Sequence, residues 1–151
     1  MPKKSAGILL YRLTGPHPEV LLLHPGGPFY AKKDAGVWSV PKGEYESGTQ
    51  EAAALREFYE ETGVQLEGPL TFLTEIKIKS GKTVYCWTKE GDLDATQIIS
   101  NLFETEWPPK SGKLQSFPEM DRGAWFTLAA AREKILPAQL PFIDALEQQL
   151  G

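Results

Sequence analysis

Cysteine is almost absent from this sequence, which contains Cys86 alone among 151 residues. A single cysteine cannot form an internal disulfide, and it cannot build a structural zinc site of cysteines. The two histidines, His17 and His24, lie in turn-like segments next to prolines, and neither shows a pairing pattern with the cysteine. We therefore expect Cys86 to be a core or strand residue rather than a nucleophile.

Long apolar runs and an excess of basic residues are missing as well. No stretch has the roughly 20 apolar residues that a membrane-spanning helix needs, and the N-terminus leads into a strand-like segment without a signal peptide. The net charge of −4 argues against non-specific binding of nucleic acid. Because 41% of the residues are hydrophobic, the chain can form a sizeable core. We predict one soluble, cytoplasmic domain covering residues 1–151, with no membrane partner.

Short apolar segments bounded by turn residues predict a mixed α/β fold. Ile76 and Ile78, for example, alternate with charged residues, which is typical of a strand with one buried face. The expected strands are 5–13, 20–23, 36–40, 71–79, 83–88 and 123–126. The expected helices are 49–62, 128–136 with Thr127 as N-cap, and 140–150.

Three glutamates gather near the end of the first expected helix. Glu57, Glu60 and Glu61 fall within an arc of about 100°, and they precede Gly63, where the helix dipole is negative. Each like-charge pair costs about 0.2–0.5 kcal/mol, which a bound cation would offset. The alternative is a solvated acidic helix end with an ordinary ion pair between Arg56 and Glu60. The opposite arc predicts the buried face: Ala52, Leu55, Phe58, Tyr59 and Thr62.

A glycine-containing loop precedes this helix, and the two segments together carry a family resemblance. Pro41-Lys42-Gly43, Glu46-x-Gly48 and Arg56-Glu57-Phe58-x-Glu60-Glu61-x-Gly63-Val64 closely resemble the box of the Nudix hydrolases. Those enzymes cleave nucleoside diphosphates linked to another group. The resemblance implies an α/β/α sandwich with a mixed β-sheet between helices, and it covers the whole chain in length and order of elements.

The resemblance also implies a metal site. Glu57 and Glu61 are expected to be direct ligands of Mg²⁺, with Mn²⁺ as a substitute, and Glu60 to be a ligand or a nearby base. The backbone carbonyl of Lys42 is expected to be a further ligand, and Arg56 to orient the acids through an ion pair. Oxygen ligands of this kind suit Mg²⁺.

Two loops supply the expected substrate contacts and a further acid. Lys42 and Lys33 are expected to meet phosphate oxygens, and Gly43 to let the loop backbone lie close to the metal. Residues 101–120 show no regular period, and irregular segments of this length are often functional. There, Trp107 either stacks on a base or folds inward as an anchor. Nudix enzymes often draw an additional glutamate from a loop at this point, for which Glu104 and Glu106 are the candidates.

One position departs from the family pattern. The residue after Gly48 is Thr49, where the family has a glutamate, and the segment that follows is one residue short. Ser47 and Gln50 have the spacing of a capping box, and we predict that this box starts the helix, with Ser47 as its N-cap.

These features predict a Mg²⁺-dependent Nudix hydrolase that cleaves a phosphoanhydride bond by attack of water at phosphorus. The expected substrate is a small nucleotide, either a dinucleoside polyphosphate or a nucleoside triphosphate, and RNA 5′ ends stay open. No stable nucleic-acid complex is expected, and the sequence does not determine the oligomeric state. The alternative is a non-catalytic nucleotide-binding or regulatory protein of the same fold.

Overall fold

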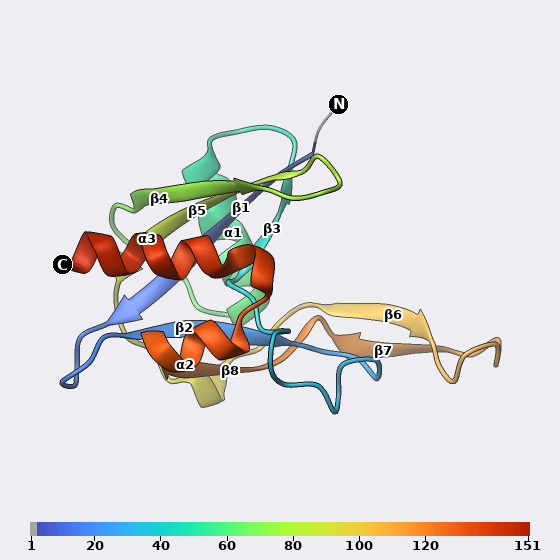
Figure 1. Ribbon diagram of the computed structural model, residues 1–151. Coiled ribbons are helices and arrows are strands. Elements are labelled where there is room, and N and C mark those ends of the chain that lie inside the picture. Colours follow the sequence, from blue (N-terminus) through green and yellow to red (C-terminus); the bar gives the residue numbers. More distant parts are fainter. Residues whose placement is uncertain (1–2) are drawn as a thin grey trace.

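A six-stranded mixed sheet lies between helices in the computed structural model, which describes residues 3–151 (Figure 1). Helix α3 lies in front of the sheet and α1 behind it, so the predicted α/β/α sandwich is confirmed. In chain order the elements are β1 (Lys4–Arg12), β2 (Glu19–Pro25), β3 (Lys42–Tyr45), α1 (Gln50–Thr62), β4 (Thr71–Lys77), β5 (Thr83–Glu90), the 3₁₀ helix η1 (Ala95–Gln97), β6 (Leu102–Glu106), β7 (Leu114–Pro118), β8 (Met120–Thr127), α2 (Leu128–Lys134), the 3₁₀ helix η2 (Pro137–Gln139) and α3 (Leu140–Leu150).

Strand β1 changes partner along one of its edges. One edge of β1 pairs in parallel with β5. The opposite edge pairs first with β3 and then, at Tyr11 and Arg12, with β2. Between these two pairings, the Ile8 N–H donates to the Pro41 carbonyl (3.1 Å), and Ser39 exchanges two hydrogen bonds with Leu23 of β2. The segment 39–41 therefore bridges the gap between β1 and β2.

Two apolar cores lie on the two faces of the sheet. Successive residues of a strand point to opposite faces, so Leu22 packs in the core that contains α3, whereas Leu21 packs in the core that contains α1. Strands buried on both faces read as continuous apolar runs, as β1 and β2 do. Cys86 is fully buried in the first core, as predicted, and this burial raises the pKa of its thiol. None of the helices within residues 3–151 combines the length and apolarity that crossing a membrane requires.

Several predictions about local structure were wrong. Residues 36–40 form only two isolated bridges instead of a strand, because Trp38 bonds to the end of α2 while Ser39 bonds to β2. Residues 101–120 are mostly a hairpin of β6 and β7, which extends away from the body (Figure 1). Its prolines and Gly112 obscured the strand pattern. His24 lies within β2 rather than in a turn.

Helix α1 begins after Thr49, so the predicted capping box at Ser47 was wrong. The backbone of Thr49 is extended (φ −79°, ψ 156°), and its Oγ1 accepts a hydrogen bond from the Ala52 N–H at 3.1 Å. The helix ends as predicted at Gly63, whose backbone is left-handed (φ 76°) and whose N–H donates to the Tyr59 carbonyl. Thr49 thus performs the capping at the position where the family has its glutamate.

Removing the threonine cap should destabilise the protein measurably. We expect Thr49→Ala to lower the free energy of unfolding by about 0.5–2 kcal/mol, because the Ala52 N–H loses its acceptor. Urea unfolding measures the change, and Ser47→Ala is the matched control with an unchanged midpoint. Equal midpoints for the two variants would contradict the assignment of Thr49 as N-cap.

Candidate active site

Glu61 is a buried acid at the centre of the predicted metal site. The residue is only 5% exposed, and its Oε1 accepts a hydrogen bond from the backbone N–H of Lys42 at 3.2 Å. Burial raises the pKa of Glu61 from 4.5 to about 8, and the negative charges of Glu119 and Glu57 act in the same direction. Helix α1 and strand β3 therefore hold this carboxyl group between them, away from water.

Glu57 lies one turn before Glu61 and packs against the backbone of Gly43. A Cβ atom at Gly43 would lie 1.8 Å from Glu57 Oε1, so glycine is what lets β3 approach this carboxylate. The other oxygen, Oε2, accepts from Arg56 Nη2 at 3.2 Å, so Arg56 pairs with Glu57 rather than with Glu60. Burial raises the pKa of Glu57, and Glu60 adds to this effect.

An acid that the sequence analysis missed, Glu119, comes near the end of α1. The Asn101 N–H donates to the Glu60 carbonyl (2.9 Å), and the Glu119 N–H donates to the Asn101 carbonyl (2.7 Å). The first of these bonds satisfies a carbonyl that the helix end leaves free. The charge of Glu119 contributes to the raised pKa of Glu61. Its only signal in the sequence is its place within residues 101–120, where an additional glutamate was expected.

The two glutamates proposed for that role, Glu104 and Glu106, lie on β6 in the hairpin, and both are exposed. The carboxylate of Glu106 accepts from the backbone N–H groups of Lys110 (2.8 Å) and Gly112 (3.1 Å), so it stabilises the turn at the hairpin tip. Neither glutamate is among the charges that shift the pKa of Glu61. Among the acids of this segment, the structure brings Glu119 to α1.

Lys42 connects the acidic face to a cavity on the opposite face of the sheet. Its backbone N–H bonds to Glu61, whereas its side chain lines a cavity of about 210 Å³ on the side of α3. The lining is mostly apolar and comes from β4, β5 and η2, with Ile76 and Val84 among its residues. Burial lowers the pKa of the Lys42 ammonium, and the charge of Lys82 adds to this effect.

The hairpin and the loop 26–36 meet through aromatic side chains. Phe29 and Trp107 pack edge to face with ring centroids 5.4 Å apart, and Phe29 is 55% exposed. The Lys33 ammonium lies 5.4 Å from the centroid of the Tyr30 ring. Trp107 therefore anchors the hairpin to the loop, which is one of the two predicted alternatives, and its stacking on a base stays a prediction.

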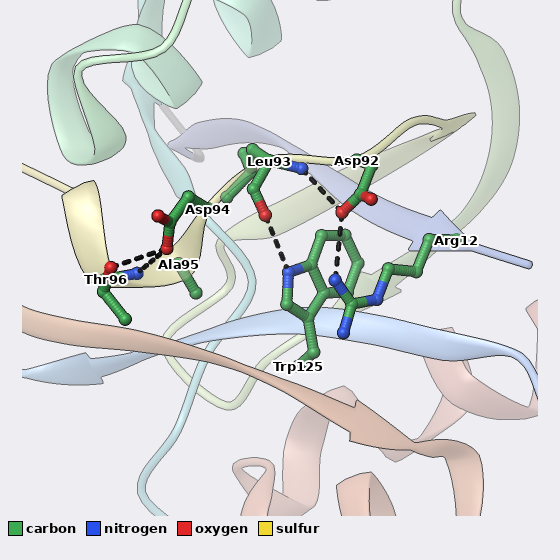
Figure 2. A pocket seen from close by; sticks show the side chains of 7 residues that line it. All are labelled: Arg12, Asp92, Leu93, Asp94, Ala95, Thr96 and Trp125. Atoms are coloured by element: carbon green, nitrogen blue, oxygen red, sulfur yellow. Dashed lines mark hydrogen bonds and ion pairs between the residues drawn. The ribbon is translucent and has the colours of Figure 1, made fainter. Parts of the chain in front are cut away.

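A more open depression of about 610 Å³ lies beside Arg12 and Trp125 (Figure 2). Its polar groups already bond to one another. Arg12 pairs with Asp92 (3.0 Å) and lies over the Trp125 ring, whose Nε1 donates to the Leu93 carbonyl (3.1 Å). None of the predicted site residues lines this depression, so we assign no substrate to it.

Substitution of Gly43 should disturb the acidic face without unfolding the protein. We expect Gly43→Ala to displace the Glu57 side chain, because the new Cβ would overlap its carboxylate. A displacement of about 1 Å should lower kcat about 10- to 100-fold, measured with Mg²⁺ in steady-state assays. Gly15→Ala is the control, since nothing lies within 4 Å of a Cβ there. Full activity of Gly43→Ala would contradict a role for Glu57 in the site.

The acidic face fits a hard divalent cation. Its donors are carboxylate oxygens, and burial raises the pKa values of Glu57 and Glu61, an effect that a bound cation would oppose. Within residues 3–151, no three side chains of histidine, cysteine, aspartate or glutamate enclose a metal position by themselves. Carboxylate oxygens suit Mg²⁺, which usually takes one or two carboxylates and completes its shell with water and substrate oxygens.

Comparisons with known proteins agree with this fold. The NUDIX domain of Shewanella oneidensis NrtR, solved with ADP-ribose, has a TM-score of 0.69 at 18% identity, covering 100% of this chain and 90% of that one. An Ap4A hydrolase from C. elegans has a TM-score of 0.66 at 23% identity, covering 97% of each chain. A mutT/nudix family protein from Listeria innocua has a TM-score of 0.64 at 15% identity, covering 99% of this chain and 95% of that one.

The family itself is shown by sequence. The search of curated proteins finds no match, but the sequence model of the NUDIX domain matches residues 1–146. This match supports the class of enzyme that the motif predicts, a pyrophosphohydrolase. Lys42 and Gly43, which were predicted to lie in a loop, belong to strand β3, and this strand lies against the glutamates of α1. The chain belongs to the NUDIX domain family.

Proposed function

We propose that this single domain is a Mg²⁺-dependent hydrolase that cleaves a phosphoanhydride bond in a nucleoside diphosphate-linked compound by attack of water at phosphorus. The observation that carries the proposal is the buried carboxyl group of Glu61. It accepts a hydrogen bond from the Lys42 N–H, and the negative charges of Glu57 and Glu119 help to raise its pKa. Such a group is costly in the free protein, and it becomes favourable where a cation and a phosphate chain bind together. A cytoplasmic location stays a prediction.

The residues of the chain have distinct roles in this proposal. Glu57 and Glu61 hold the cation, with Glu60 and the Lys42 carbonyl as further ligands, and Arg56 orients Glu57 through the bond at 3.2 Å. When bound, the cation neutralises phosphate oxygens and lowers the pKa of water. We propose that the carboxylate of Glu119, in place of Glu104 or Glu106, is the general base that accepts a proton from the attacking water. Lys33 and Lys42 contribute positive charge, and Trp107 a stacking surface.

The proposed substrate class rests on the cavity that the Lys42 side chain lines, on the face of the sheet opposite the acids. Its volume of about 210 Å³ exceeds the roughly 150 Å³ cavity that holds benzene, so it can accept a nucleobase ring. This supports a dinucleoside polyphosphate or a nucleoside triphosphate as substrate. Of the structural relatives, one is an Ap4A hydrolase, which supports a dinucleoside polyphosphate, and another was solved with ADP-ribose, which fits only the broader class of nucleoside diphosphate-linked compounds.

Product analysis tests the proposal. The purified chain is incubated with Mg²⁺ and a panel of dinucleoside polyphosphates, nucleoside triphosphates, nucleotide sugars and capped RNA, and the products are identified by mass spectrometry. Reaction in ¹⁸O-labelled water shows which phosphorus is attacked. We expect a nucleoside monophosphate or a shorter phosphate as product. Saturable, metal-dependent binding of nucleotide without release of phosphate would overturn the proposal in favour of a non-catalytic binding protein.

A further inference from the structure

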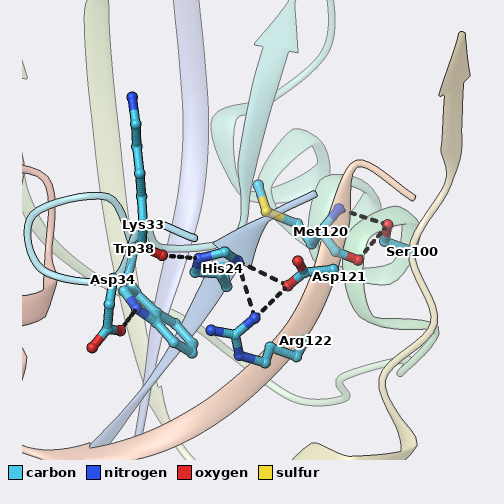
Figure 3. Close-up of polar contacts among 8 residues, drawn as sticks. All are labelled: His24, Lys33, Asp34, Trp38, Ser100, Met120, Asp121 and Arg122. Carbon is cyan, nitrogen blue, oxygen red and sulfur yellow. Dashed lines mark hydrogen bonds and ion pairs between the residues drawn. The ribbon is translucent and has the colours of Figure 1, made fainter. Parts of the chain in front are cut away.

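His24 is a fully buried polar residue that the proposed chemistry does not use. Its exposed fraction is 0%, and it lies in β2 where the pairing with β8 shifts register between His24 and Pro25. Buried polar groups need hydrogen-bond partners. Both nitrogens of this ring have one, and the partners belong to segments far apart in the sequence (Figure 3).

One ring nitrogen binds the loop 26–36. The His24 Nε2 lies 2.6 Å from the backbone carbonyl of Lys33, and because a carbonyl can only accept, Nε2 carries the hydrogen. The Lys33 side chain points away from the ring, toward Tyr30. This bond therefore fixes the backbone of the loop at Lys33 and leaves its ammonium free to meet a ligand.

The other nitrogen binds strand β8. The His24 Nδ1 lies 2.9 Å from Asp121 Oδ1 and 3.3 Å from Arg122 Nη1, so it has an acceptor or a donor in either protonation state. Arg122 also bonds to Asp121 and lies over the Trp38 ring, against which the edge of His24 packs. His24 and Arg122 thus both contact the Asp121 carboxylate.

The segment that contains Asp121 also contains Glu119. The Gly26 N–H donates to the Glu119 carbonyl at 2.8 Å, and a Cβ at Gly26 would lie 1.9 Å from the Pro118 carbonyl oxygen, so the two backbones are in close contact. The Ser100 Oγ accepts from the Met120 N–H at 2.9 Å. A shift of Asp121 would therefore move the backbone next to Glu119.

We propose that His24 is a positioning residue that joins two segments of the site: through Nε2 it holds the loop of Lys33, and through Nδ1 it holds the segment of Glu119. The kinetic consequences rest on the proposed function, in which Lys33 meets phosphate and Glu119 serves as the base. The contacts by which His24 joins the loop 26–36 to β8 do not depend on the proposed function.

Two amide substitutions separate the two bonds. The side-chain nitrogen of asparagine reaches the position of Nδ1, and that of glutamine reaches the position of Nε2. His24→Asn therefore keeps the bond to Asp121 and loses the bond to Lys33, whereas His24→Gln does the reverse. His17→Asn and His17→Gln are matched controls, because His17 is exposed.

Limited digestion with trypsin measures how readily the loop 26–36 is cleaved, since Lys32 and Lys33 are exposed cleavage sites within it. We expect His24→Asn to be cut after these lysines about 10-fold faster than wild type, which is the effect of one lost buried hydrogen bond. His24→Gln should be cut at the wild-type rate. In steady-state assays, His24→Asn should raise KM with kcat unchanged, and His24→Gln should lower kcat about 10-fold with KM unchanged.

Equal cleavage rates for the two His24 variants, or the same kinetic change in both, would overturn the proposal. If neither variant folds, Asp121→Asn keeps His24 and weakens its second bond. It should then match the behaviour expected of His24→Gln, and wild-type kinetics would overturn the proposal. A chain that hydrolyses nothing refutes the proposed function alone, because the trypsin comparison needs no substrate and still decides whether His24 holds the loop.

Discussion

Glu61→Gln should abolish nearly all turnover and yet stabilise the metal-free protein at alkaline pH. The loss of a ligand carboxylate should lower kcat about 1,000-fold, equivalent to roughly 4 kcal/mol of transition-state stabilisation. The gain in stability follows from burial, because the folded protein holds this carboxyl group largely out of water. Steady-state assays with Mg²⁺ and urea unfolding in the presence of a chelator measure the two effects.

The sign of the pH effect follows from the raised pKa. The pKa of Glu61 is about 8 in the folded protein against an ordinary value of 4.5. Between these values the folded state binds more protons than the unfolded state, so the free energy of unfolding falls as the pH rises from about 4.5 to about 8. The full penalty, on the order of 5 kcal/mol, applies above pH 8 and is absent in Glu61→Gln.

Magnesium should reverse this dependence in the wild type. A cation that binds only the folded state adds RT ln(1 + [L]/Kd) to the stability, so Mg²⁺ should raise the unfolding midpoint most strongly at pH 8 and above. Glu67→Gln is the control, since Glu67 is exposed in the loop after α1. If Glu61→Gln retained wild-type turnover, or if Mg²⁺ stabilised both proteins equally, the assignment of Glu61 as a ligand would be wrong.

Phe58→Ala should destabilise the protein more than an alanine substitution at any other position of α1. Phe58 is fully buried in the core between α1 and the sheet, so its truncation leaves a cavity that should cost about 3–5 kcal/mol. The total free energy of unfolding of a typical domain is about 5–15 kcal/mol. The variant should therefore show a large fall in its urea midpoint at neutral pH.

The neighbouring aromatic residue provides the control. Tyr59 was predicted to lie on the buried face, but it is 50% exposed. Tyr59→Ala should therefore change the stability by about 0.5 kcal/mol or less. The buried residues of α1 are Ala53, Ala54, Phe58, Glu61 and Thr62, so the packed arc is rotated from the predicted one and includes one of the acids. Similar losses in the two variants would contradict this orientation of the helix.

Local features of the site could be read from the sequence because they depend on neighbours in the chain. The helix spacing brought Glu57 and Glu61 to one face, and Gly63 marked the left-handed end. The orientation of α1 could not be read, because it depends on how Tyr45 of β3 and Leu70 pack beneath the helix. Periodicity predicts that an apolar stripe exists, but it does not show how the helix is rotated against the sheet or that strand β3 covers Glu61.

Features that join distant segments could not be read either. His24 and Asp121 are separated by 97 positions in the sequence, and only the pairing of β2 with β8 brings them together. Glu119 reaches α1 through two backbone hydrogen bonds involving Asn101, which carry no signal in side-chain identity. The hairpin that contains Glu104 and Glu106 had to be recognised before either could be set apart from Glu119.

The segment 39–41, which bridges β1 and β2, has a consequence for how this protein could change over evolution. It leads directly into Lys42, whose backbone faces the acids of α1 while its side chain lines the cavity on the α3 side. In the proposed function, the backbone of Lys42 thus belongs to the part of the site that cleaves the bond, and its side chain belongs to the part that would recognise the organic group of the substrate. Substitutions in the cavity wall, such as at Ile76 or Val84, can alter substrate preference without touching the acids, so selection can act on the two properties separately.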